Sequence, residues 1–325
     1  MKITRISSAL ALLAASTVAL SASGAKANLW NSGDLIGVGA QVSSTNVDTG
    51  YVYDFTSGKM LYQSTSIAQF ESVAYNAYNN TLVLSPQSGG GIYSLSQNGN
   101  FSLLSNTSLE LTSLETDSSG NIFGNAYGGF YAKFTSTGSV ANLTNDGITA
   151  VSSSLSANEK TAYLATSSGV EVVNLATAAV SALPGIMGSQ AAYAVYVMPN
   201  GDLLASNMNE IYQLNPTTGA VISSTNVSAY GSNFEIGLSN NGSSILSVSG
   251  SGQVVWNYAF TTGTTLAGYS AGLNYNIVSF VGVNAPTALN QQSPSPAPEP
   301  SSAAVLLSGI ALVLLARRAR KRYSL

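Results

Sequence analysis

The chain has 325 residues, of which 45% are hydrophobic and 8% charged, and it contains neither cysteine nor histidine. These absences exclude disulfide frameworks, thiolate or imidazole metal sites, and any catalytic apparatus built on Cys or His. The length is sufficient for one large all-β domain or two smaller domains. Residues 28–292 carry 13 carboxylates and three lysines, a net charge of −10. Because such a surface repels phosphate backbones, we expect no nucleic-acid partner.

The N-terminus has the pattern of a secretory signal peptide over residues 1–27. A short basic start precedes the mostly apolar stretch from Ala9 to Leu20, and Ala25-Lys26-Ala27 is a small-x-small cleavage site. This order predicts export through the Sec translocon, with Ala25 and Ala27 recognised at the cleavage point. A buried N-terminal helix is the alternative interpretation.

The C-terminus predicts a membrane-spanning segment. After a Ser/Pro linker over residues 291–297 come Pro298-Glu299-Pro300 and an apolar run from Ser301 to Ala316. A basic cluster ends the chain: Arg317, Arg318, Arg320, Lys321 and Arg322. The run of 16 residues is slightly short of the ~20 usually needed, but flanking Arg and Lys can reach the headgroups. We therefore expect a transmembrane helix with the basic cluster in the cytoplasm and the bulk of the chain outside the inner membrane.

These C-terminal residues resemble the PEP-CTERM sorting signal, assigned to residues 298–325. The three parts of that signal are the Pro-Glu-Pro motif, one apolar span and a terminal basic cluster, and all three occur here in order. The resemblance implies a Gram-negative bacterium and processing by the membrane enzyme exosortase. It also implies delivery to the cell surface or the extracellular matrix, in association with exopolysaccharide and biofilm. A simple tail anchor with an accidental Pro-Glu-Pro is the alternative.

The region between the two ends contains a repeat of about 40 residues. Short predicted strands end in Thr/Ser-Gly turns, and the last apolar residue before each turn is Phe55, Leu95, Phe134, Leu175, Leu214 or Tyr258. The spacings are 40, 39, 41, 39 and 44 residues. A second hairpin, marked by Asn-Asn, Ser-Gly, Ala-Asn or Asn-Gly, precedes each of these residues after the first. Four short strands per repeat are typical of a β-propeller blade.

The predicted fold is therefore all-β, a six-bladed β-propeller of four-stranded blades over residues 28–290. The first unit lacks room for an inner strand, and a spare strand, Asn276 to Val283, follows the sixth. We expect this spare strand to complete the first blade and close the ring. The repeat is similar in pattern to NHL, YVTN and quinoprotein-type propellers over most of residues 35–283. A pair of β-sandwiches, a solenoid and a seven-bladed ring are the alternatives.

Acidic residues near the predicted inner strands are the candidate metal ligands. Glu71 and Glu235 occupy matching places at the start of two inner strands, and Glu115 and Asp117 lie close to a third. Carboxylates that converge on the axis could hold Ca²⁺, as in six-bladed lactonase-like propellers. No calcium-loop motif repeats, so solvated rim residues are the competing interpretation. Residues 117–121 and 145–147 could likewise be calcium loops, but their composition favours ordinary turns.

Aromatic residues recur at equivalent strand positions: Tyr53, Tyr93, Tyr212 and Trp256. Such rings could stack on sugars, but the recurrence favours packing between blades. We expect a non-catalytic binding or structural module at the cell surface, without a cofactor and with extracellular polysaccharide as a candidate partner. A calcium-dependent hydrolase or lactonase is the alternative, although the usual bases and nucleophiles are missing.

Overall fold

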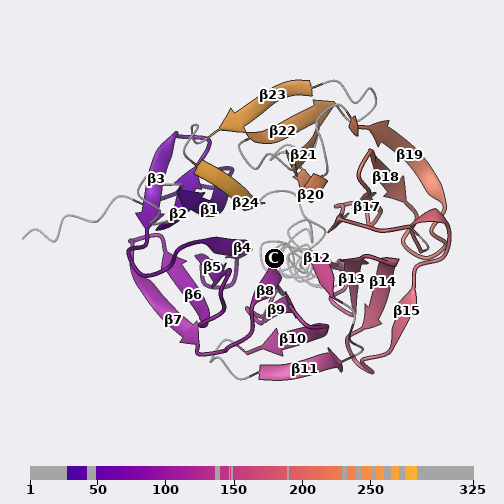
Figure 1. Cartoon of the computed structure of the whole chain (residues 1–325), viewed down its shortest axis with the longest axis horizontal. Coiled ribbons are helices and arrows are strands. Elements are labelled where there is room, and N and C mark those ends of the chain that lie inside the picture. The colour runs from indigo at the N-terminus through magenta and orange to yellow at the C-terminus, as the bar shows by residue number, and fades with distance from the viewer. Residues whose placement is uncertain are drawn as a thin grey trace, which may run out of the picture.

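A computed structural model describes residues 28–41, 49–135, 140–145, 147, 149–188, 190–228, 233–238, 244–249, 254–259, 265–270 and 275–283. These residues form six four-stranded antiparallel sheets arranged in a ring (Figure 1). The predicted β-propeller is therefore confirmed, whereas the sandwich and solenoid alternatives are wrong. The innermost strands surround the axis, and the fourth strand of each sheet lies at the rim.

The sheets follow one another along the chain. The first contains β24 (Tyr275–Gly282), β1 (Leu35–Gln41), β2 (Thr49–Asp54) and β3 (Lys59–Gln63). The second contains β4 (Phe70–Asn76), β5 (Thr81–Pro86), β6 (Ile92–Ser96) and β7 (Phe101–Ser105). The third contains β8 (Leu111–Thr116), β9 (Ile122–Ala126), β10 (Phe130–Phe134) and β11 (Val140–Asn145).

The other three sheets repeat the pattern. The fourth contains β12 (Ala150–Leu155), β13 (Thr161–Thr166), β14 (Gly169–Asn174) and β15 (Val180–Ala182), and a short 3₁₀ helix, η1 (Ile186–Gly188), follows it. The fifth contains β16 (Ala194–Val197), β17 (Leu203–Ser206), β18 (Glu210–Leu214) and β19 (Val221–Asn226). The sixth contains β20 (Asn233–Leu238), β21 (Ser244–Ser249), β22 (Val254–Ala259) and β23 (Thr265–Ser270).

The two ends of the ring join in the first sheet. Strand β24 pairs antiparallel with β1, from Leu35 opposite Gly282 to Gln41 opposite Tyr275. The expected closure by the spare strand is confirmed, since β24 supplies the inner strand that the N-terminal part of the chain lacks. Because both ends of the repeat pair within this sheet, the ring is closed. No further segment is then needed to cover an exposed edge at an open end.

Turn chemistry in the sequence explains the sharp strand connections. Asn80, Gly120 and Gly201 have positive φ angles of 55°, 80° and 88° in turns between first and second strands. The turns between third and fourth strands use the same device, and there Ala178 adopts φ 58° where related turns have glycine. An L-residue other than glycine accepts this conformation only at a cost. The Asn174 side chain helps to hold the turn by accepting hydrogen bonds from the Ala176 and Thr177 amides at 2.9 and 3.1 Å.

The core lies between neighbouring sheets. Trp30, Ile36, Phe70 and Leu82 are fully buried in a cluster that joins the first sheet to the second. Similar clusters of buried aliphatic and aromatic side chains lie between the other described sheets. At about 1.5–3 kcal/mol for each fully buried large side chain, these contacts hold the ring together.

The predicted fold class needs one correction. The sequence predicted a transmembrane helix over the run from Ser301 to Ala316, in addition to the propeller. No helix in the described part of the chain is long and apolar enough to cross a membrane. The described structure is all-β apart from η1, and the signal peptide, the linker and the sorting signal lie outside the described residues.

Candidate functional site

A cavity of about 330 Å³ occupies the centre of the ring. The innermost strands β24, β4, β8, β12, β16 and β20 all contribute to its wall, mainly through their C-terminal halves. The turn residues Ala77 and Ser118 continue the wall beyond the ends of β4 and β8. The volume lies at the lower end of the range for ligand pockets, about 300–1,000 Å³, so the cavity is large enough for a small organic molecule.

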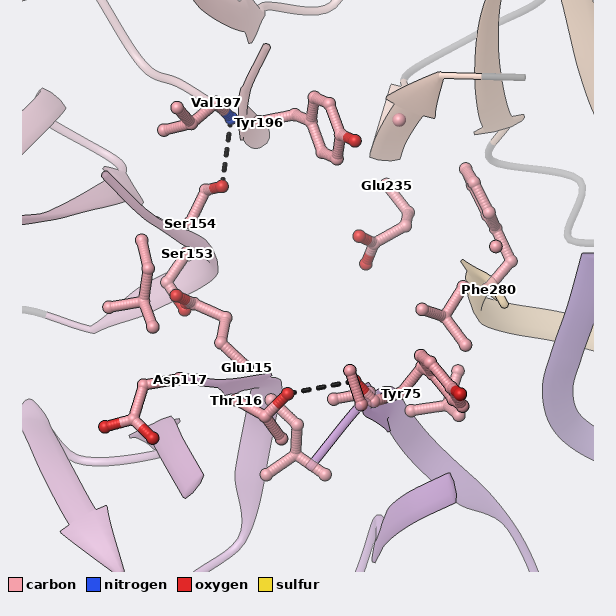
Figure 2. Close-up of a pocket in the computed structure, with 18 of the residues that line it drawn as sticks. Tyr75, Glu115, Thr116, Asp117, Ser153, Ser154, Tyr196, Val197, Glu235 and Phe280 are labelled. Carbon is pink, nitrogen blue, oxygen red and sulfur yellow. Dashed lines mark hydrogen bonds between the residues drawn. The ribbon is translucent and has the colours of Figure 1, made fainter. Parts of the chain in front are cut away.

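Side-chain hydroxyl groups form hydrogen bonds between neighbouring inner strands around the cavity. The Ser154 hydroxyl accepts a hydrogen bond of 2.9 Å from the Val197 amide, which links β12 to β16. The Thr116 hydroxyl donates to the Tyr75 carbonyl at 2.9 Å and links β8 to β4 (Figure 2). Neighbouring inner strands belong to different sheets, so these side-chain bonds replace the ladder that strands within a sheet share. These bonds connect neighbouring inner strands around the cavity.

Glu115 lines the cavity from β8, and its carboxyl group lies toward Ser153 (Figure 2). Both of its carboxyl oxygens are buried, and neither has a hydrogen-bond partner among the described residues. Burial raises the pKa of Glu115 to about 8, and the nearby Ser153 hydroxyl lowers it in part. The carboxyl is therefore mainly protonated at neutral pH, because burial without a counter-charge disfavours the ionised form.

Glu235 faces the same cavity from β20 (Figure 2). Two sheets separate β8 from β20 in either direction around the ring, so the two carboxyl groups approach from opposite sides. Burial raises the pKa of Glu235 to about 8, with a further rise from Glu115 and a decrease from the Ser279 hydroxyl. The two glutamates therefore line one cavity from opposite sides, and each has a raised pKa.

Aromatic rings complete the wall. Tyr75 and Tyr78 come from β4 and the turn after it, Tyr196 comes from β16, and Phe280 comes from β24. Burial raises the pKa of Tyr196 well above its usual range. Tyr78 is 69% exposed, a large value for an aromatic residue at the mouth of a cavity. Among the described residues that line the cavity, none carries a positive charge.

The structure separates the two glutamates that the sequence proposed as metal ligands. Glu235 lines the cavity, but Glu71 does not. The Glu71 carboxylate instead accepts a hydrogen bond of 3.1 Å from Gln69, and burial and then the charge of Glu110 raise its pKa against the effect of that bond. Within the described ranges, no three acidic side chains come close enough together to hold a metal ion.

The Asp117 side chain stabilises the turn over residues 117–121 by hydrogen bonds. Its carboxylate accepts hydrogen bonds from the Ser119 and Asn121 amides at 3.0 and 2.8 Å, and from the Asn121 side chain at 2.7 Å. The interpretation of residues 117–121 as an ordinary turn is consistent with these bonds. The turn at residues 145–147 includes Asp146, which lies outside the described residues.

The recurrent aromatic residues pack in the protein. Tyr93 stacks on Phe101 within the second sheet at 5.0 Å between ring centroids, and Tyr62 of the first sheet stacks on the same ring at 4.3 Å. Tyr53 contacts Phe55 edge to face at 5.3 Å, and Tyr212 is buried. The side chain of Trp256 lies outside the described residues. The aromatic residues at the cavity are different ones, and the repeat pattern gave no sign of them.

The sorting residues Pro298, Glu299 and Pro300, the basic cluster, and the cleavage residues Ala25 and Ala27 all lie outside the described residues. Their predicted roles remain predictions.

Solved structures share the fold. The chain is similar to one in the crystal structure of a nidogen/laminin complex, with a TM-score of 0.60 and 9% identity, over 76% of this chain and 97% of that one. It is similar to a protein of unknown function from Bacteroides caccae, with a TM-score of 0.56 and 11% identity, over 77% and 98% of the two chains. The β-propeller domain of Cps50 (Swd1) from Myceliophteria thermophila gives a TM-score of 0.54 at 9% identity, over 74% and 87%.

No protein-family model matches the sequence, and neither does any curated protein. Identities this low show the fold alone. The chain is a β-propeller, and this fold is consistent with a binding or structural module.

Proposed function

We propose that the chain is an exported, non-catalytic binding module that takes a saccharide unit of an extracellular polysaccharide into its central cavity. The observation that carries this proposal is the lining of the cavity, which combines hydroxyl groups, protonated carboxyl groups and aromatic rings from all six inner strands. Sugars offer the matching groups, since their hydroxyls exchange hydrogen bonds and their apolar faces stack on aromatic rings.

The titration state of the cavity suits a ligand that both donates and accepts hydrogen bonds. With pKa values raised to about 8, Glu115 and Glu235 are mainly protonated at pH 7. A protonated carboxyl donates one hydrogen bond and accepts others, as a sugar hydroxyl requires. The same protonation argues against catalysis, because neither carboxyl is then available as a base or nucleophile. The sequence also contains no histidine or cysteine to take that role.

The binding experiment compares two tryptophan variants of the full chain. Ala77 is exposed and lines the mouth of the cavity, so Ala77→Trp obstructs it. Ala182 is exposed on β15 at the rim, so Ala182→Trp is a matched control away from the cavity. Calorimetric titration with oligosaccharides from the host matrix should show binding by the wild type and the rim variant and loss of binding in the Ala77 variant. Equal binding by all three proteins would place the saccharide elsewhere, and hydrolysis of the oligosaccharides would refute the non-catalytic role.

Export and sorting are tested separately from binding. We propose that residues 1–27 direct export and that exosortase recognises Pro298-Glu299-Pro300 and delivers the chain to the cell surface. Replacing Glu299 with Gln in the host should change the cellular fraction in which the protein accumulates, or the size of the mature chain, on immunoblots. An unchanged fraction and size would contradict the sorting role and leave the binding proposal standing.

A further inference from the structure

The cavity has one feature that a neutral sugar does not explain. Two glutamates line it, and no described residue of its wall is basic. Glu115 and Glu235 line the cavity from opposite sides (Figure 2), and Glu115 raises the pKa of Glu235. Neither oxygen of Glu115 has a hydrogen-bond partner among the described residues. A buried carboxyl without partners costs free energy, which a bound group of the right chemistry can recover.

The surroundings of the pair are unusual for acids. Described residues that line the cavity include no lysine or arginine. Tyr75, Tyr196 and Phe280 line the same cavity as the two glutamates (Figure 2). Aromatic faces attract cations, particularly organic ammonium groups, and two carboxylates add direct Coulomb attraction. Acids and aromatic rings in a cavity without basic residues form a receptor for an organic cation.

A divalent metal ion fits this cavity less well. Calcium requires six to eight oxygen ligands at 2.3–2.6 Å, whereas no group of three acidic residues is close enough to share an ion in the part of the chain that the structure describes. A volume of about 330 Å³ is also much larger than one ion needs. Apolar side chains such as Leu114 and Val195 form part of the wall, and these favour carbon-bearing ligands.

We propose that the central cavity binds an organic ammonium group between Glu115 and Glu235, so that the ligand of this module carries a cationic nitrogen. This inference rests on the proposed binding role of the cavity and names the chemical class of its ligand. Binding of the cation ionises at least one of the two carboxyl groups, and the displaced proton leaves to solvent.

Other titratable groups face the pair from the surrounding strands. Tyr75 and Tyr78 lie on β4 and its turn, Asp117 follows β8, and Tyr196 lies on β16. Tyr131 of β10 is also near Glu115, and burial and then that carboxyl raise its pKa well above the ordinary value. Strands β12 and β24 contribute no titratable group to the wall. Burial raises the pKa of both Glu115 and Glu235 to about 8, so we expect these two groups to exchange protons near neutral pH.

The test uses choline and 3,3-dimethyl-1-butanol, two probes of nearly the same shape, of which only choline is charged. Calorimetry with the wild-type chain at pH 7.5 should show choline binding at least about tenfold more tightly than the alcohol. Repeating the titration in buffers of different ionisation enthalpy should show release of about one proton per choline bound. Affinity for choline should rise as the pH increases from 6 toward 8, since ionising the carboxyl groups then costs less.

Two variants identify the groups responsible. Glu115→Gln with Glu235→Gln should abolish both the preference for choline and the proton release. Glu71→Gln, which changes a largely buried glutamate outside the cavity, should preserve both. Equal affinity for the two probes, or a preference that survives in the double variant, would overturn the proposal. If oligosaccharides bind in the cavity and choline does not, this inference fails and the proposed function stands.

Discussion

Replacing Glu115 and Glu235 by glutamine should remove most of the decrease in stability that the wild-type protein shows between pH 5 and pH 8.5. The pKa of each carboxyl is raised from 4.5 to about 8, primarily by burial. Between these two values the folded state holds more protons than the unfolded state, so the free energy of unfolding falls as pH rises. The stabilising contribution is complete below pH 4.5 and is lost as the pH rises through about 8. Glutamine imitates the protonated form at every pH.

The size of the effect follows from the same pKa values. At about 1.4 kcal/mol for each pKa unit, a rise from 4.5 to about 8 gives a ceiling of about 5 kcal/mol per group. The effective dielectric of a protein interior screens buried charges and lowers this ceiling, so we expect a loss of about 2–4 kcal/mol for the pair. The double variant should equal the wild type in stability at pH 5 and exceed it by this amount at pH 8.5.

Urea unfolding at the two pH values, followed by the fluorescence of the buried Trp30, measures the difference. Glu71→Gln is the single-site control, because the pKa of Glu71 is also raised but its side chain lies outside the cavity. A double variant with the same pH profile as the wild type would refute the reasoning that the cavity holds two protonated acids.

Four further predictions concern the ring itself. A Cβ on Gly219, where φ is +66°, would lie 1.6 Å from the Pro184 carbonyl oxygen, so Gly219→Ala should destabilise the protein by more than about 2 kcal/mol in thermal melts. Gly90→Ala, at φ +95° with nothing within 4 Å of its Cβ, should cost only about 1 kcal/mol. Phe101→Ala should cost about 3 kcal/mol in urea unfolding, because that ring stacks against both the first and the second sheet. Deleting residues 275–283 removes the strand that pairs with β1 and should abolish cooperative unfolding, whereas a sharp transition would show that closure is dispensable.

The repeat in the sequence predicts the fold because local turn chemistry recurs with the strands. Asn, Gly and Thr-Gly positions determine where strands end, and the positive φ of Asn80 and Gly201 satisfies that expectation. The pairing of β24 with β1 was also predictable, because the first unit lacks an inner strand and one strand is left over at the end. The hydroxyl bonds between inner strands were not predictable, since they join residues about 40 positions apart, such as Ser154 and Val197.

The candidate site was predicted only in part. Glu235 was identified as a candidate ligand, whereas its partner across the cavity is Glu115 and not Glu71. Matching places in the repeat favoured Glu71, but Glu71 lies at the irregularity in the pairing of β4 with β5, whereas Glu235 follows the equivalent irregularity in β20. Alternate residues of a strand face opposite ways, so the two side chains diverge. The sequence analysis named Glu115 only as an acid close to an inner strand, and in the structure it follows the buried Leu114 within β8. The aromatic wall could not be found, because Tyr196 and Phe280 do not occupy the recurrent aromatic positions of the repeat.

A structure of the full chain crystallised with a bound matrix oligosaccharide tests the central claim most directly. The account predicts ligand density inside the ring, within hydrogen-bond distance of Ser154 or of one of the two cavity glutamates. Density confined to the rim strands at saturating ligand, with the cavity holding only water, would contradict it.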